Sequence, residues 1–124
     1  MSIVGLHHAL LLVSSEECLD FYKALGFEES YRRARQSDTV VLLEAYSFQL
    51  EVFIDPRHPQ KAEGEQEPLG PRHFALRVDD ISATLIFLRE QGIDVEGVEV
   101  GNDWTGVKYC YLHDPDGNQV ELHE

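Results

Sequence analysis

The sequence predicts an α+β fold built from two equivalent βαβββ modules that lie side by side around a cleft. The main observation is a repeat, because each half of the chain has one helical segment set among strand-like segments in the same order. The spacing repeats too: His8 precedes Gly26 by 18 residues, and His73 precedes Gly92 by 19. The alternation of apolar and polar residues over 119–123 is typical of half-buried strands.

The chain is expected to form one domain over residues 1–124, since this length can bury a single core. Residues 55–70 contain three of the five prolines and show no apolar period, which is typical of a linker or a lid loop. This segment separates module one, residues 1–54, from module two, residues 71–124.

Module one has the signals of one helix and four strands. Ser14 and Ser15, followed by Glu16 and Glu17, are typical of a helix N-terminus, and Gly26 is typical of a helix end. β-branched and apolar runs predict strands over residues 3–13, 27–33, 39–43 and 48–54.

Module two repeats this order. Asp79 and Asp80 predict the start of a helix that ends at Gly92. Strands are predicted over residues 72–78, 94–100, 107–112 and 119–123, with a loop over 101–106. Between the last two strands, Asp114-Pro115-Asp116-Gly117 is a strong turn signal and predicts a closing β-hairpin.

Charge and cysteine content exclude several classes of partner. The net charge of −13 leaves no electrostatic footprint for nucleic acid or an anionic membrane, so any site for an anion must be local. Cys18 and Cys110 are isolated, which favours buried structural thiols in a reducing cytoplasm over a disulfide framework. No apolar run approaches membrane-spanning length, and no signal peptide is evident.

Strand alternation places one His and one Glu on the non-core face of each module. His8 on the first strand and Glu51 on the fourth belong to module one, and His73 and Glu121 hold the corresponding places in module two. Equivalent modules would bring all four into one cleft. His7 would replace His8 as the candidate if the strand register were shifted by one residue.

Two imidazoles and two carboxylates suit a borderline divalent ion such as Zn, Ni, Co, Mn or Fe. Each residue alone has a simpler interpretation. A single His in an apolar strand is more often a hydrogen-bonded core or surface residue, and a single Glu in an alternating strand is usually solvated. The recurrence of the same residue types at the same places in both halves favours the metal-bearing cleft.

Several motifs together resemble the vicinal oxygen chelate superfamily, which includes glyoxalase I, bleomycin-resistance proteins, extradiol dioxygenases and fosfomycin-resistance enzymes. Nearly the whole chain is covered. The matching pieces are Leu6-His-His-Ala-Leu-Leu-Leu-Val13, Phe21-Tyr22 with Leu25-Gly26-Phe27, Leu50-Glu-Val52, Arg72-His-Phe-Ala-Leu-Arg-Val-Asp-Asp80 and Asp114-Pro-Asp-Gly-Asn-Gln-Val-Glu-Leu122.

The resemblance implies paired βαβββ modules that form a curved mixed sheet around a metal-bearing cavity, often completed in a homodimer. Carried over from glyoxalase I, the metal shell is His8, Glu51, His73 and Glu121. The family's glyoxalase I motif has an Arg four residues after the first ligand, where it helps to hold glutathione. Leu12 stands at that position here, and Arg77 is at the equivalent place in module two.

By this resemblance, the expected activity is of the lactoylglutathione lyase type: isomerisation of a 2-oxoaldehyde–thiol adduct through a metal-bound enediolate. Glu121 or Glu51 would be the general base, while Arg77, Lys108 and Trp104 are candidate substrate contacts. A core position for Trp104 and a solvated surface position for the two cations are the alternatives. The competing functions are another metal-dependent enzyme, such as a thiol transferase acting on an antibiotic, an epimerase or a dioxygenase, and a metal-free protein that binds small molecules.

Overall fold

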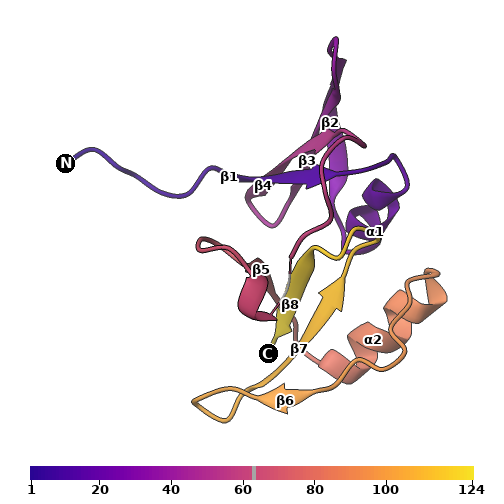
Figure 1. Cartoon of the computed structure of the whole chain (residues 1–124). Helices are drawn as coiled ribbons and strands as arrows, with labels where there is room; N and C mark the ends of the chain where they lie inside the picture. Colours follow the sequence, from indigo (N-terminus) through magenta and orange to yellow (C-terminus); the bar gives the residue numbers. More distant parts are fainter. Residues whose placement is uncertain (63) are drawn as a thin grey trace. The chain divides into compact units, whose positions relative to one another are not determined.

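A computed structural model describes residues 1–62 and 64–124 (Figure 1). The chain divides into two compact units, unit 1 over Met1–Pro59 and unit 2 over Gln60–Glu124. Each unit contains one four-stranded mixed sheet and one α-helix, which confirms the predicted pair of βαβββ modules and the α+β class. In the part of the chain that the structure describes, no helix has the length and apolarity needed to cross a bilayer.

Unit 1 is a sheet with the strand order β1-β4-β3-β2. β1 runs parallel to β4, and the other neighbours are antiparallel. Its elements are β1 (His8–Val13), α1 (Cys18–Ala24), β2 (Glu28–Ala34), β3 (Thr39–Ala45) and β4 (Phe48–Ile54).

Unit 2 has the same topology, with the strand order β5-β8-β7-β6 and a parallel β5–β8 pair. Its elements are the short 3₁₀ helix η1 (Gly64–Gln66), β5 (His73–Arg77), α2 (Ile81–Glu90), β6 (Gly101–Asn102), β7 (Lys108–His113) and β8 (Gln119–His123). The parallel pair places the first strand of each module beside its last one, where the predicted His and Glu residues lie.

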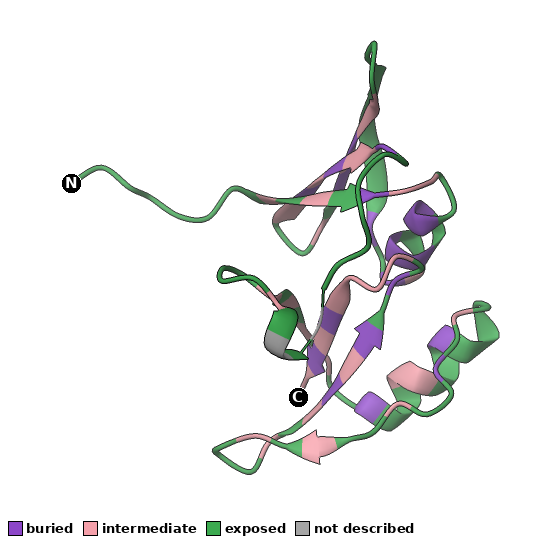
Figure 2. Ribbon diagram, in the orientation of Figure 1, coloured by how far each residue is buried: buried purple, intermediate pink, exposed green. Residues whose placement is uncertain are grey.

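The core of each unit is built from alternate strand positions and from one side of the helix (Figure 2). The predicted periodicity is therefore correct in the segments that pair. Buried apolar residues of unit 1 include Val13, Leu19, Tyr22, Phe27, Val41, Leu43, Leu50 and Val52, and those of unit 2 include Ile81, Leu88, Leu112, Val120 and Leu122. Cys18 and Cys110 are both buried among these side chains, and burial raises the pKa of the Cys110 thiol.

The hairpin predicted between the last two strands forms as expected. The Asp114 carboxylate accepts hydrogen bonds from the backbone N–H groups of Asp116 and Asn118, at 2.9 and 2.8 Å. The Gly117 N–H donates to the Asp114 carbonyl at 2.9 Å, and Gly117 has a φ of 84°. The turn thereby aligns β7 with β8.

The first strand is shorter than predicted, because residues 3–7 lie outside it and Ile3, Val4 and Leu6 are exposed. Strand pairing explains this difference. His8 lies opposite Gln49, and β4 begins at Phe48 after a turn in which Tyr46 and Ser47 both have positive φ. Residues before His7 therefore have no residue of β4 to pair with.

The predicted strand over 94–100 is wrong, since the segment that pairs with β7 is Gly101–Asn102, which the sequence assigned to a loop. The Asp94 side chain accepts a hydrogen bond from the Glu96 N–H at 3.0 Å, and Gly97 has a φ of 76°. This local turn is incompatible with an extended strand, although the apolar alternation of the segment is strand-like.

The two helix starts differ in how well they were predicted. The Asp80 side chain caps α2 by accepting a hydrogen bond from the Ala83 N–H, as expected. The helix α1 begins only at Cys18, and its N-cap residue Glu17 makes no side-chain capping bond. The predicted hydroxyl cap of α1 at Ser14 and Ser15 is therefore wrong in position.

Gly26 gives a prediction for stability. It has a φ of 106°, and a Cβ added there would collide with the Tyr46 hydroxyl, which donates a hydrogen bond to the Leu25 carbonyl. We expect Gly26→Ala to lower the free energy of unfolding by about 2–3 kcal/mol, from backbone strain and overpacking together. Urea unfolding of the full-length protein measures this loss.

Gly92 is the matched control, since it follows α2 at the equivalent place. It has a φ of 86°, and none of the described heavy atoms lies within 4 Å of an added Cβ. Gly92→Ala should therefore show backbone strain alone, with a loss of about 1 kcal/mol. Equal losses in the two variants would contradict a role for the Tyr46 contact.

Candidate metal centre

In unit 1, the structure brings His8 and Glu51 together on the face of the sheet opposite the core. The His8 Nε2 atom lies 3.0 Å from the Glu51 Oε2 atom. Glu51 is opposite Leu10 in the parallel pairing, and the strand burial pattern alternates as predicted. Both side chains remain partly exposed, so their donor atoms are accessible.

In unit 2, His73 and Glu121 form the equivalent pair. The His73 Nε2 atom lies 3.4 Å from the Glu121 Oε1 atom, and Glu121 is opposite Ala75. In both units, the Glu faces the residue two positions after the His on the neighbouring parallel strand. The duplication seen in the sequence thus produces the same donor pair twice.

The spacing within each pair fits two ligands of one ion. Metal–ligand bonds of about 2.0–2.2 Å place two donors on neighbouring positions about 3.0 Å apart at a right angle and about 3.4 Å apart at the tetrahedral angle. The observed separations are 3.0 and 3.4 Å. Among the described residues, no group of three or more His, Cys, Asp or Glu side chains is close enough to hold a metal, so each unit presents two of the four predicted ligands.

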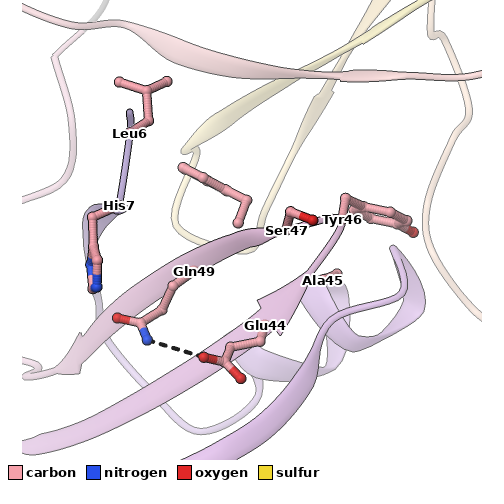
Figure 3. Close-up of a pocket in the computed structure, with 8 residues that line it drawn as sticks. Leu6, His7, Glu44, Ala45, Tyr46, Ser47 and Gln49 are labelled. Atoms are coloured by element: carbon pink, nitrogen blue, oxygen red, sulfur yellow. Dashed lines mark hydrogen bonds between the residues drawn. The ribbon is translucent and has the colours of Figure 1, made fainter. Parts of the chain in front are cut away.

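His7 does not take the place of His8. It lies before β1, and its Nδ1 atom is 2.8 Å from the Nδ1 atom of His8. His8 therefore directs Nε2 toward Glu51 while its other ring nitrogen has a polar neighbour, an arrangement typical of metal-bound imidazoles. His7 also lines a hollow with Glu44 and Gln49, which are hydrogen bonded at 3.2 Å (Figure 3).

The environments of the two glutamates differ. Glu51 is opposite Leu10 and Leu42, whereas Glu121 is opposite Ala75 and Tyr111. Glu51 has its close ion-pair contact with His8 and also lines a hollow with Tyr31, Arg33 and Arg35.

Tyr111 lies beside the His73–Glu121 pair and was not predicted from the sequence as a site residue. Its ring contacts that of His73 in an edge-to-face arrangement, with centroids 5.2 Å apart. Burial raises the pKa of the Tyr111 hydroxyl, and the negative charge of Glu121 raises it further. The signal was available, since Tyr111 alternates with the buried Cys110 and Leu112 and therefore faces Glu121.

The three predicted substrate contacts differ in which face of unit 2 they occupy and in how exposed they are. Arg77 lies on the same face as His73 and is exposed. Lys108 alternates with Tyr109 and so lies on the face opposite to Glu121. Trp104 has a relative exposure of 103%, which excludes the core position that was its alternative.

His123 forms a further polar cluster with Asp103 and Glu124 on the face of the sheet that presents Glu121. Its Nε2 atom is 2.7 Å from the Asp103 Oδ2 atom, and its Nδ1 atom is 2.8 Å from the Glu124 carbonyl oxygen. The hydrogen bond to Asp103 raises the pKa of His123. Hydrogen bonds from Thr105 and Val107 hold the pKa of Asp103 well below its usual range. This cluster joins β8 to the loop before β7.

The fold and the site define a class of proteins built by duplication of one βαβββ module. Each module of this chain has a His and a Glu on adjacent parallel strands. The chain belongs to the Glyoxalase/Bleomycin resistance protein/Dioxygenase superfamily, whose sequence profile matches residues 5–122. This confirms the resemblance found in the sequence.

Individual relatives agree with this assignment. The uncharacterized protein YaeR of Escherichia coli (strain K12) is 31% identical over 123 residues, covering 94% of each chain. The crystal structure of a glyoxalase family protein from Enterococcus faecalis matches with a TM-score of 0.87 and 37% identity over the whole of both chains. A lactoylglutathione lyase from Agrobacterium tumefaciens matches with a TM-score of 0.69 and 21% identity, covering 100% of this chain and 96% of that one, which shows the shared fold alone.

Proposed function

We propose that the protein is a metal-dependent enzyme that isomerises an adduct of a 2-oxoaldehyde and a thiol, as glyoxalase I does. The observation that supports this most is the pair of equivalent His–Glu contacts, His8 with Glu51 and His73 with Glu121. In this proposal each pair supplies two ligands to a divalent ion. When bound, the ion supplies a Lewis acid for two adjacent oxygens of the substrate.

The chain's own residues would then move the proton. Glu121 would accept the C–H proton on one carboxylate oxygen and return it to the neighbouring carbon, so that an oxoaldehyde adduct becomes a hydroxy thioester. Tyr111 faces Glu121 across the β7–β8 pair and, with its raised pKa, remains a protonated hydroxyl that can donate to that carboxylate. Glu51, which contacts His8 at 3.0 Å, would remain a ligand.

Nitrogen and oxygen donors without thiolate favour Zn, Ni, Co, Mn or Fe over a soft ion such as Cu(I).

The identity of the thiol depends on residues outside the four candidate ligands. Leu12 stands where glyoxalase I motifs have an Arg for glutathione, and it is a half-exposed apolar residue on the His8 face. Arg77 is the proposed substitute in unit 2.

The direct test measures thioester formation from methylglyoxal and glutathione. Metal-stripped full-length protein would be refilled separately with Zn²⁺, Ni²⁺, Co²⁺ or Mn²⁺. We expect turnover with at least one ion and none in the stripped protein. If an ion binds and no thioester forms, this reaction with glutathione is excluded. Dependence on Fe²⁺ and O₂ would instead indicate a dioxygenase.

A further inference from the structure

We infer that a hollow beside Glu51 binds an anionic oxygen group of the substrate, a carboxylate or a phosphoryl group, through Arg33 and Arg35. The inference deepens the proposed function and depends on it in one respect, since it takes the anion to be part of the molecule that reacts. The hollow lies wholly within unit 1 and has a volume of about 470 Å³. Its lining residues are Tyr31, Arg33, Ala34, Arg35, Gln36, Val40 and Glu51.

Strand pairing places Arg33 on the same face as the candidate metal ligands. Arg33 is opposite Val40, which is in turn opposite Phe53. Directly opposed residues of neighbouring strands share a face, and Phe53 shares its face with Glu51, two residues earlier on β4. The guanidinium of Arg33 therefore belongs to the surface that presents Glu51.

Arg35 is held over the same face by two contacts. Its guanidinium carbon lies 4.6 Å from the centroid of the Phe53 ring. Its Nε and Nη2 atoms each donate to the Asp38 carboxylate at 2.7 Å, which leaves the two N–H groups of Nη1 outside this pair. The hydrogen bonds to Asp38 raise the pKa of Arg35, and the charge of Glu51 raises it slightly further. Arg35 is thus a charged, pre-positioned donor.

Arg33, by contrast, has no hydrogen bond or ion pair to any residue that the structure describes, and it is exposed. The charge of the neighbouring Arg32, in contrast, is compensated, because its guanidinium forms ion pairs with Glu16 and Glu29 on the opposite face. An uncompensated guanidinium is unexpected in a chain with a net charge of −13. It gives the hollow, which the Glu51 carboxylate also lines, a cation that is available to hold an anion.

The donor groups that line the hollow favour an oxyanion as its ligand. A guanidinium presents N–H groups in a planar fork that matches the oxygens of a carboxylate or a phosphoryl group. Tyr31, opposite Leu42 and therefore on the same face, adds a hydroxyl donor to the lining. An apolar substrate would gain little from these groups.

The first test follows anion binding by NMR on full-length, metal-free protein, so that it does not depend on catalysis. Titration with inorganic phosphate and, separately, with acetate should shift the backbone amide signals of residues 31–36 in a saturable way. Arg33→Gln should weaken this binding by about tenfold or more. Arg89→Gln, which removes the same charge from an exposed position on α2, should leave it unchanged. Saturation by only one anion would identify the group.

The second test is steady-state turnover of the methylglyoxal–glutathione adduct by the metal-loaded enzyme. Arg33→Gln should raise KM about tenfold while kcat stays within about threefold. Anion binding that depends on Arg33 without any turnover would exclude the reaction with glutathione and leave the anion site standing. Turnover and anion binding that are the same in Arg33→Gln and Arg89→Gln would overturn the inference.

Discussion

Replacing Glu121 by Gln should lower kcat by about 100-fold or more while the protein keeps its metal ion. A positioned general base contributes about 10²–10⁴-fold to proton transfer, and an amide cannot accept a proton. An amide oxygen can still coordinate a metal, so the substitution separates the base role from the ligand role. The measurements are kcat for thioester formation and metal content after dialysis.

Glu99→Gln is the matched control for the Glu121 variant. Glu99 is an exposed carboxylate in the same unit, and its replacement removes the same charge. We expect it to keep full activity. Retained turnover in Glu121→Gln would rule out the base role of Glu121, and a loss confined to Glu51→Gln would transfer that role to module one.

Removing the His8 imidazole should weaken metal binding more than 100-fold. Loss of a hydrogen-bonding partner around a metal site typically costs about 10–100-fold in affinity, and loss of a direct ligand should exceed this. The His8 Nε2 atom is one of the two donors in unit 1, so His8→Ala leaves Glu51 without its partner. Competition with a chelating dye measures the affinity.

His7→Ala is the control, because His7 is adjacent in sequence yet lies outside β1. It should weaken binding by at most about 10–100-fold, through loss of the contact with His8. His73→Ala should match His8→Ala, and the wild-type chain should bind one ion. A loss of affinity in only one of these two variants would contradict equal ligand roles for the two pairs.

Strand parity explains why much of the candidate site could be predicted. In a strand, successive side chains point to opposite faces, so the face of Glu51 follows from its buried neighbours Leu50 and Val52. The same rule places Glu121 between Val120 and Leu122. These assignments are local, and they needed no knowledge of which strands pair.

Which segments pair as strands cannot be read from alternation alone. The predicted strand over residues 94–100 and the predicted start of the first strand were therefore wrong. The alternation over residues 94–100 is strand-like, yet the Asp94 turn prevents pairing and β7 takes Gly101–Asn102 instead. The apolar residues before His8 remain exposed because the turn at Tyr46 and Ser47 ends the partner strand. A local turn decided the first outcome, and the extent of the partner strand β4 decided the second.

By itself, the sequence determined the duplicated βαβββ order, the closing turn at Asp114 and the faces of the four candidate ligands, because each depends on neighbouring residues. The tertiary structure decided that His8 and not His7 meets Glu51, that Tyr111 faces Glu121, and that Arg33 shares a surface with Glu51. These contacts join residues on different strands, so they follow from strand register, which is set by the packing and hydrogen bonding of the whole sheet.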